Sequence, residues 1–344
     1  MNTTIADLYP DIWEYVFEYF SAIELLFSFT NTTHVVNEVL KNSKNPFLFR
    51  GVILDSFTFT LPQKLRFNKI SSLELHQENS LDIIEKCTGM RSLKLVGTSE
   101  WIVSIFVKLL NVRIKIEKLI LIMPGIGSLD KIFNSIGSLF SLLRLEIYAN
   151  ESEEKMQMSS LSIQQTNIRQ FILHSCSSIS WSDMSTLLPT LQNIDFLNIT
   201  LCEKNTNNFF MFNFPKLTYV RLMLHELPFE TIFELLTTIP VLRKLKVNGL
   251  VDDINFLIDN KWIRLFSLCS SLNMVIVNLS LEEYDDLFRD EIIQKALNQI
   301  NLHLGCLTDD NDDHSTGIYQ QRWWQLSGMI MKHQILSKHI YEMH

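Results

Sequence analysis

One stretch of the sequence places glycines where they could hold a nucleotide. The apolar string IEKLILIM, which begins at Ile116, is followed by Pro124-Gly-Ile-Gly127 and then by apolar residues at helical spacing. A strand, a glycine turn and a helix in this order bind the pyrophosphate of dinucleotides. Asp130 occupies the third glycine position, and its carboxylate would repel a pyrophosphate at the start of a helix. The sequence therefore disfavours a nucleotide-dependent α/β enzyme.

Residues with metal-binding or catalytic side chains form no recognised pattern elsewhere. An EF-hand loop starting at Asp309 requires Gly at its sixth position and Glu at its twelfth, but these positions hold His314 and Gln320. We expect this acidic run to be a solvated loop. The pair His225-Glu226 lacks the second His of a zinc-protease motif. The sequence predicts no enzyme activity, no metal site and no cofactor, and the cysteines form no CxxC pair: Cys87, Cys176, Cys202, Cys269 and Cys306.

Composition and charge exclude several classes of protein. The chain has 344 residues, of which 47% are hydrophobic, so it can bury a large core. The net charge of −8 is concentrated in residues 281–313, which hold ten acidic and two basic residues. The remaining residues are balanced in charge and form no basic stripe, which argues against a nucleic-acid partner.

The N-terminal sequence indicates the compartment. It carries Asp7, Asp11 and Glu14 instead of the cationic region of a signal peptide. No run of about 18 apolar residues follows that could span a membrane. We therefore expect a cytoplasmic and/or nuclear protein with no membrane partner.

An apolar-x-x-apolar-x-apolar string repeats nine times through the middle of the chain. Such a string predicts a strand, because alternate side chains of a strand share one face. The last two apolar residues of each string would then point into the core, and the residues between and beside them would point outward. The strings begin at Ile70, Met90, Ile116, Leu142, Ile168, Leu191, Leu217, Leu242 and Leu272.

The segments between the strings favour helices. Residues 98–112, 128–143 and 228–240 carry apolar residues at helical spacing. Each unit thus reads as strand, turn and helix, and stacked units would share one continuous core. The string and its spacing resemble leucine-rich repeats. The resemblance implies an α/β solenoid, with a curved parallel sheet and helices on its convex side.

The first 45 residues form a different unit. In DIWEYVFEYF, Asp11, Glu14 and Glu18 lie on one narrow stripe of a helix, and the rest of its surface is apolar. Ser21 and Glu24 form a capping box that begins a second helix, and a third apolar segment follows at 35–40. Three short helices cannot bury this much apolar surface by themselves, so a partner is expected to cover part of it.

The segment LYPDIWEYVFEYFSAIELLFSFTNT resembles an F-box. The matching residues are those of LxPDI at its start, of VFxYF in the first helix and of ELL in the second. The resemblance implies that the chain binds the Skp adaptor of a cullin–RING ubiquitin ligase and recruits a protein substrate through its repeats. The alternative is a leucine-rich interaction or inhibitor scaffold without a ligase role. The residues expected to contact the adaptor are Leu8, Pro10, Ile12, Val16, Phe17, Phe20 and Leu25.

These patterns divide the chain into four parts. Residues 1–45 are the three-helix F-box, 46–68 a linker into the solenoid, 69–280 the repeats and 281–344 an acidic cap and tail. Helical spacing runs through YDDLFRDEIIQKALNQI in the last part. The pair Trp323-Trp324 either packs back on the last repeats or forms an exposed anchor, and we expect packing.

The outward residues of repeats four to eight are the candidate substrate site. They mix aromatic rings with both signs of charge, which is typical of an interaction surface. Three of them, Arg221, Lys244 and Lys246, form a basic cluster that could bind an acidic or phosphorylated motif, although a merely solvated surface is the alternative. The full set is Arg144, Glu146, Tyr148, Ile172, His174, Asp195, Tyr219, Arg221, Lys244 and Lys246.

Overall fold

A computed structural model describes most of the chain. The chain divides into two compact units. Unit 1 comprises residues 1–124 and 128–148, and unit 2 comprises residues 125–127 and 149–344. The described residues are 10–17, 19–20, 24–25, 28–29, 32–41, 51–54, 67–77, 82–112, 114–125, 129–149, 166–175, 184, 186–202, 214–225, 227–251, 253–257, 259–283, 307–311 and 322–331.

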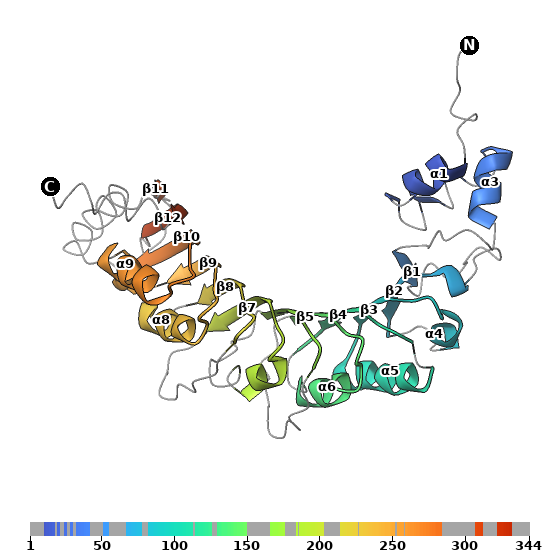
Figure 1. Cartoon of the computed structure of the whole chain (residues 1–344), viewed down its shortest axis with the longest axis horizontal. Helices are drawn as coiled ribbons and strands as arrows, with labels where there is room; N and C mark the ends of the chain where they lie inside the picture. The colour runs from blue at the N-terminus through green and yellow to red at the C-terminus, as the bar shows by residue number, and fades with distance from the viewer. Residues whose placement is uncertain are drawn as a thin grey trace, which may run out of the picture. The chain divides into compact units, whose positions relative to one another are not determined.

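Unit 1 begins with helices and continues as alternating strands and helices. Its strands pair in the order β1-β2-β3-β4-β5, and the registers of the first four are parallel. Figure 1 shows α4, α5 and α6 on one side of these strands. The elements are α1 (Pro10–Phe17), α3 (His34–Lys41), β1 (Val52–Leu54), η2 (Phe67–Lys69), β2 (Ser72–His76), α4 (Asp82–Lys86), β3 (Ser92–Val96), α5 (Ser99–Val112), β4 (Lys118–Met123), α6 (Leu129–Ile136) and β5 (Arg144–Ala149).

Unit 2 continues the same alternation and ends with two antiparallel pairings. Its strands β6 to β10 pair in sequence order and in parallel, and β12 lies antiparallel between β10 and β11. In Figure 1, α8 and α9 lie on one side of β8, β9 and β10. The elements are β6 (Gln170–Ser175), η3 (Leu188–Leu191), β7 (Phe196–Cys202), β8 (Tyr219–His225), α8 (Phe229–Thr237), β9 (Lys244–Val251), η4 (Ile254–Leu257), α9 (Asp259–Leu268), β10 (Met274–Glu283), β11 (Leu307–Asn311) and β12 (Arg322–Met331).

The apolar strings form the core strands. In eight of the nine strings all three apolar residues are buried, as Leu242, Leu245 and Val247 illustrate. The alternating burial along β2, β3 and β4 follows from the two-residue period of a strand. The chain is therefore an α/β protein in which parallel strands occur at the spacing predicted from the sequence.

The sixth string was predicted in the wrong register. The buried pair in β7 is Leu197 and Ile199, whereas Phe196 is only half-buried. Both readings satisfy the same spacing, because Leu191 and Ile194 can each begin an apolar-x-x-apolar-x-apolar string. Leu191 instead ends the 3-10 helix η3, so the strand starts later.

Three predicted helical segments contain helices, and two further helices, α4 and α9, were not predicted. The segments 98–112, 128–143 and 228–240 contain α5, α6 and α8, although α6 ends at Ile136 and is followed by a turn. Of these two, α9 places the fully buried Trp262 against Phe229 and Phe256, with ring centroids 5.1 and 6.4 Å away. Trp262 Nε1 donates to the Phe256 carbonyl at 2.8 Å, so the buried indole is satisfied.

The C-terminal segment adds strands to unit 2. Asp309 and Asp310 lie in β11, which corrects the expectation of a loop, and aspartate is depleted in strands, so its composition gave no strand signal. In β12, Trp323 and Trp324 lie opposite Glu282 and Leu281 of β10. The backbone of β12 thus pairs with the last repeat strand, whereas the contacts of the Trp323 and Trp324 side chains lie outside what the structure describes. The predicted helical run 284–300 lies outside the described residues.

Candidate functional site

The outward residues of unit 1 neutralise one another. Glu146 Oε1 accepts from Lys118 Nζ at 2.9 Å and from Arg144 Nε at 2.8 Å, and the Tyr148 hydroxyl donates to Glu146 Oε2 at 2.9 Å. Glu146 is only 5% exposed beneath these groups. The predicted residues Arg144, Glu146 and Tyr148 are therefore brought together, and their polar atoms contact each other.

The cations around Glu146 determine its ionisation. Burial alone would raise the pKa of Glu146. The hydrogen bonds from Lys118 and Tyr148, with the charges of Lys118 and Arg144, outweigh burial and lower the pKa from its ordinary value of 4.5. Glu146 is therefore an ionised structural carboxylate at neutral pH.

The lowered pKa predicts how the stability of the protein depends on pH. A carboxyl whose pKa is lower in the folded state stabilises the fold above its unfolded pKa, and this contribution is lost as the pH falls through the folded pKa. We expect Glu146→Gln to be less stable than the wild type at neutral pH, and the difference to shrink below pH 4.5. Urea unfolding over a pH series measures this.

Glu117 provides the control for that experiment. Its ion pair with Arg91 spans 2.6 Å, but the two side chains are 41% and 65% exposed. Exposed ion pairs contribute about 0–1 kcal/mol, so Glu117→Gln should change stability little at any pH. Equal pH profiles for the two variants would contradict the role assigned to Glu146.

The outward face of β8 and β9 holds unpaired positive charge. Arg221 lies opposite Lys246 and Tyr219 lies opposite Lys244 in the parallel register. Lys244 Nζ lies 4.9 Å from the centroid of the Tyr219 ring, whose other neighbour is Phe196 at 5.0 Å. Within the described part of the chain, the half-buried side chains of Arg221 and Lys246 form no ion pair or hydrogen bond. These cations are available to an anionic ligand.

A buried amide lies beside this cluster. Asn198 of β7 is opposite Arg221 and is 5% exposed. Its Nδ2 donates to His174 Nε2 at 3.1 Å, and with Nε2 as acceptor the His174 Nδ1–H donates to Thr200 Oγ1 at 3.2 Å. Among the residues that the structure describes, none donates a hydrogen bond to Asn198 Oδ1. Since an unsatisfied buried acceptor is costly, a bound donor would stabilise this position.

The candidate substrate residues are only partly assembled as predicted. His174, Tyr219, Arg221, Lys244 and Lys246 share the outward strand face of unit 2. Asp195 is a correction, because it precedes β7 and its carbonyl accepts from the backbone of Thr218 and Tyr219.

Two neighbours complete the description of this face. Ile172 lies opposite Asn198 on this face, but it is only 5% exposed and so offers little surface to a ligand. The residue that replaces Asp195 in the row is Asn198, which lies between Ile172 and Arg221 in the register. The sequence contains its signal, since Asn198 stands between Leu197 and Ile199 in the alternative string.

The helical part of unit 1 buries two residues predicted to contact an adaptor. Phe17 and Leu25 are fully buried, which corrects that expectation. The Phe17 ring lies 5.5 Å from Trp13 and 5.3 Å from Phe29, so the wide apolar arc of α1 is partly used for internal packing.

Other residues of the predicted adaptor set are accessible. Ile12 is 43% exposed, and Val16 and Phe20 are half-buried. Leu8 lies outside the described residues, and Pro10 begins α1. The adjacent Tyr19, which was not in the predicted set, is 73% exposed.

The described residues include no metal-binding cluster and no membrane-spanning helix, and burial keeps one of their cysteines protonated. No group of three or more His, Cys, Asp or Glu residues in that part of the chain could hold a metal ion. Burial raises the pKa of the Cys87 thiol to about 12, so this cysteine is protonated at neutral pH. Among the helices described, none has the length and hydrophobicity needed to cross a membrane.

Comparison with protein-family models, curated proteins and solved structures finds no match to this chain.

Proposed function

We propose that the chain is a non-enzymatic substrate receptor of an SCF-type ubiquitin ligase. The N-terminal helices bind the Skp adaptor, and the outward strand face of unit 2 binds the protein substrate. The observation that carries the proposal is the pair of unpaired cations, Arg221 and Lys246, on a parallel-strand face beside the orphan acceptor of Asn198. Together with Lys244, these cations suit an acidic or phosphorylated segment, because Arg and Lys form charge-assisted hydrogen bonds with such groups. The acceptor Asn198 Oδ1 would pair with an N–H of the same segment and not with its anionic group.

The adaptor half of the proposal depends on the exposed residues of α1. Ile12→Asp places a charge on a side chain that is 43% exposed, so the fold should tolerate it. An apolar anchor in an interface contributes about 2 kcal/mol or more, so we expect about thirtyfold weaker adaptor binding. Co-expression with the Skp adaptor, followed by titration of the purified proteins, measures this.

Two further variants separate adaptor contact from folding. Ile53→Asp introduces the same change at another exposed isoleucine of unit 1, which is 36% exposed and outside the helices, and it should leave adaptor binding intact. Phe17→Ala should lower thermal stability first, because Phe17 is buried against Trp13 and Phe29. Full adaptor binding by Ile12→Asp would place the contact elsewhere.

A second function, that of an interaction scaffold without a ligase role, is favoured by one observation. Phe17 and Leu25 are buried within the helical part, so less apolar surface remains for an adaptor than the sequence suggested. The same titration separates the two functions, since a scaffold would bind its substrate and show no affinity for the Skp adaptor.

A further inference from the structure

Unit 1 exposes large apolar side chains on α5 and on the segment that follows α6. Seven large apolar residues are exposed in the described part of the chain, and four of them belong to α5 or to the segment after α6: Val107, Leu110, Phe140 and Leu143. Phe140 is 77% exposed. Two of these four, Leu110 and Phe140, line one pocket, and apolar side chains that lie together mark interaction sites more often than scattered ones do.

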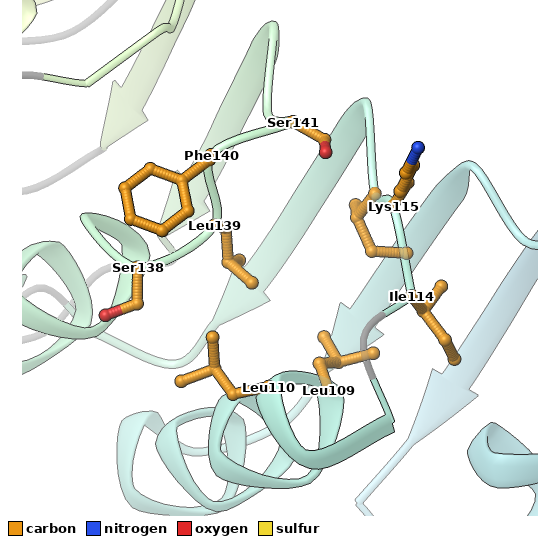
Figure 2. A pocket seen from close by; sticks show the side chains of 9 residues that line it. Leu109, Leu110, Ile114, Lys115, Ser138, Leu139, Phe140 and Ser141 are labelled. Carbon is orange, nitrogen blue, oxygen red and sulfur yellow. The ribbon is translucent and has the colours of Figure 1, made fainter.

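This pocket lies between α5 and the turn after α6, and its described lining includes neither Val107 nor Leu143. Its volume is about 270 Å³, and it is lined by the end of α5, the segment before β4 and the turn after α6. Figure 2 shows Leu109 and Leu110 on the side of α5, with Leu139 and Phe140 across from them. A hollow with apolar walls and a few polar groups is the usual form of a site for an inserted side chain.

The polar groups at the rim define the charge of the ligand. Among the described lining residues, Lys115 is the one charged side chain, Ser138 and Ser141 contribute hydroxyls, and none is acidic. Lys115 is exposed and, among the residues that the structure describes, forms no ion pair or hydrogen bond through its side chain. In Figure 2 its amine points away from the apolar walls. A carboxylate outside the pocket could reach it while an apolar group fills the interior.

We propose that this pocket docks a short segment of a partner protein that carries a large apolar residue and a nearby Asp or Glu. The apolar side chain inserts between Leu110 and Phe140, and the carboxylate pairs with Lys115. In a symmetric dimer through this pocket, Lys115 would meet no acid among the described lining residues of the other copy, so a second copy bound in this way is a poorer occupant. One cation is also too few for binding to an anionic membrane surface, to which each basic residue contributes only about 1 kcal/mol.

The test uses the full chain and does not depend on the ligase proposal. A display library of random short peptides is selected on the immobilised wild-type chain and depleted on the Leu110→Asp variant. We expect the enriched peptides to combine Leu, Phe, Ile or Met with an acidic residue. A synthetic peptide with the enriched sequence is then titrated against both chains, and Leu110→Asp should bind it at least about tenfold more weakly.

Matched variants separate the pocket from the rest of the surface. Val107→Asp makes the same kind of change on α5 outside the pocket lining and should retain full affinity. Lys115→Glu should weaken the acidic peptide and strengthen a version in which Lys replaces its acid, whereas Lys131→Glu on α6 should do neither.

Several results would overturn the proposal. These are the absence of enriched peptides, an enriched sequence that is basic, and equal binding to the Leu110→Asp variant. Analytical ultracentrifugation that shows a wild-type dimer, dissociated by Leu110→Asp, would identify a second copy as the occupant. Sedimentation of the wild type with anionic phosphatidylserine vesicles, lost in Lys115→Glu, would identify a lipid surface.

Discussion

Leu245→Ala should lower the free energy of unfolding by about 2–5 kcal/mol, because it truncates a fully buried side chain of β9. Lys246→Ala, one residue further along, should change it by less than about 1 kcal/mol, since the Lys246 side chain forms no ion pair or hydrogen bond within the described part of the chain. Chemical denaturation monitored by circular dichroism gives both values.

In unit 1, the corresponding core residue and its outward neighbour are Leu145 and Arg144, and here both substitutions should be destabilising. Leu145 is fully buried, so Leu145→Ala should also cost about 2–5 kcal/mol. The outward neighbour Arg144 is a poor neutral control, because it donates to the buried Glu146 at 2.8 Å. Arg144→Ala would leave that carboxylate with fewer partners, so a measurable loss of stability is expected there as well.

These pairs test the strand register directly. A shift of one residue would exchange the core and outward faces of a strand. Similar losses for Leu245→Ala and Lys246→Ala, with unchanged denaturant dependence, would contradict the register of β9. A loss at Lys246 larger than that at Leu245 would place the core on the opposite face.

The period of the apolar residues explains why most strands were predictable. A strand that is buried on one face requires two apolar side chains two residues apart, and Leu245 with Val247 satisfies this locally. The register of β7 was not predictable by that rule, because Leu191 and Ile194 begin equally good strings. Only the 3-10 helix that ends at Leu191 separates the two readings.

Contacts between distant residues were the least predictable part of the molecule. The sequence shows that α1 is apolar around most of its surface, but it does not show that Phe17 packs on Trp13 and Phe29. Similarly, the strand β12 depends on pairing with β10, which is far from it in the sequence. Such pairings depend on tertiary contacts and override local propensity.

Some features of the candidate site follow from the local sequence, and others depend on contacts between distant residues. The outward direction of Arg221, Lys244 and Lys246 follows from alternation, and the register places them on adjacent strands. That Glu146 is neutralised by Lys118 depends on a neighbouring strand, so the sequence alone did not separate occupied from available charges. The structure therefore shifts the candidate site to the cations of unit 2.

Reversing these cations should abolish binding of anionic segments. Each charge-assisted hydrogen bond contributes about 1.5–3 kcal/mol, so Arg221→Glu, Lys244→Glu and Lys246→Glu together should weaken binding at least about thousandfold. The probes are two synthetic peptide libraries that differ only in a central phosphoserine or serine. We expect the full wild-type chain to bind the phosphoserine library selectively and the triple variant to bind neither.

The control must change the charge of unit 2 by the same amount at other positions. Arg169, Lys216 and Arg243 are exposed cations that precede β6, β8 and β9, so reversing all three alters the net charge equally without changing the outward strand face. Long-range attraction would weaken in both triple variants and would disappear at high salt. A specific site predicts that binding is lost only in the Arg221, Lys244 and Lys246 variant, with adaptor binding retained. Equal losses in the two triple variants would show that these cations form only a solvated surface, because binding would then depend on the net charge of unit 2 and not on the positions of the cations.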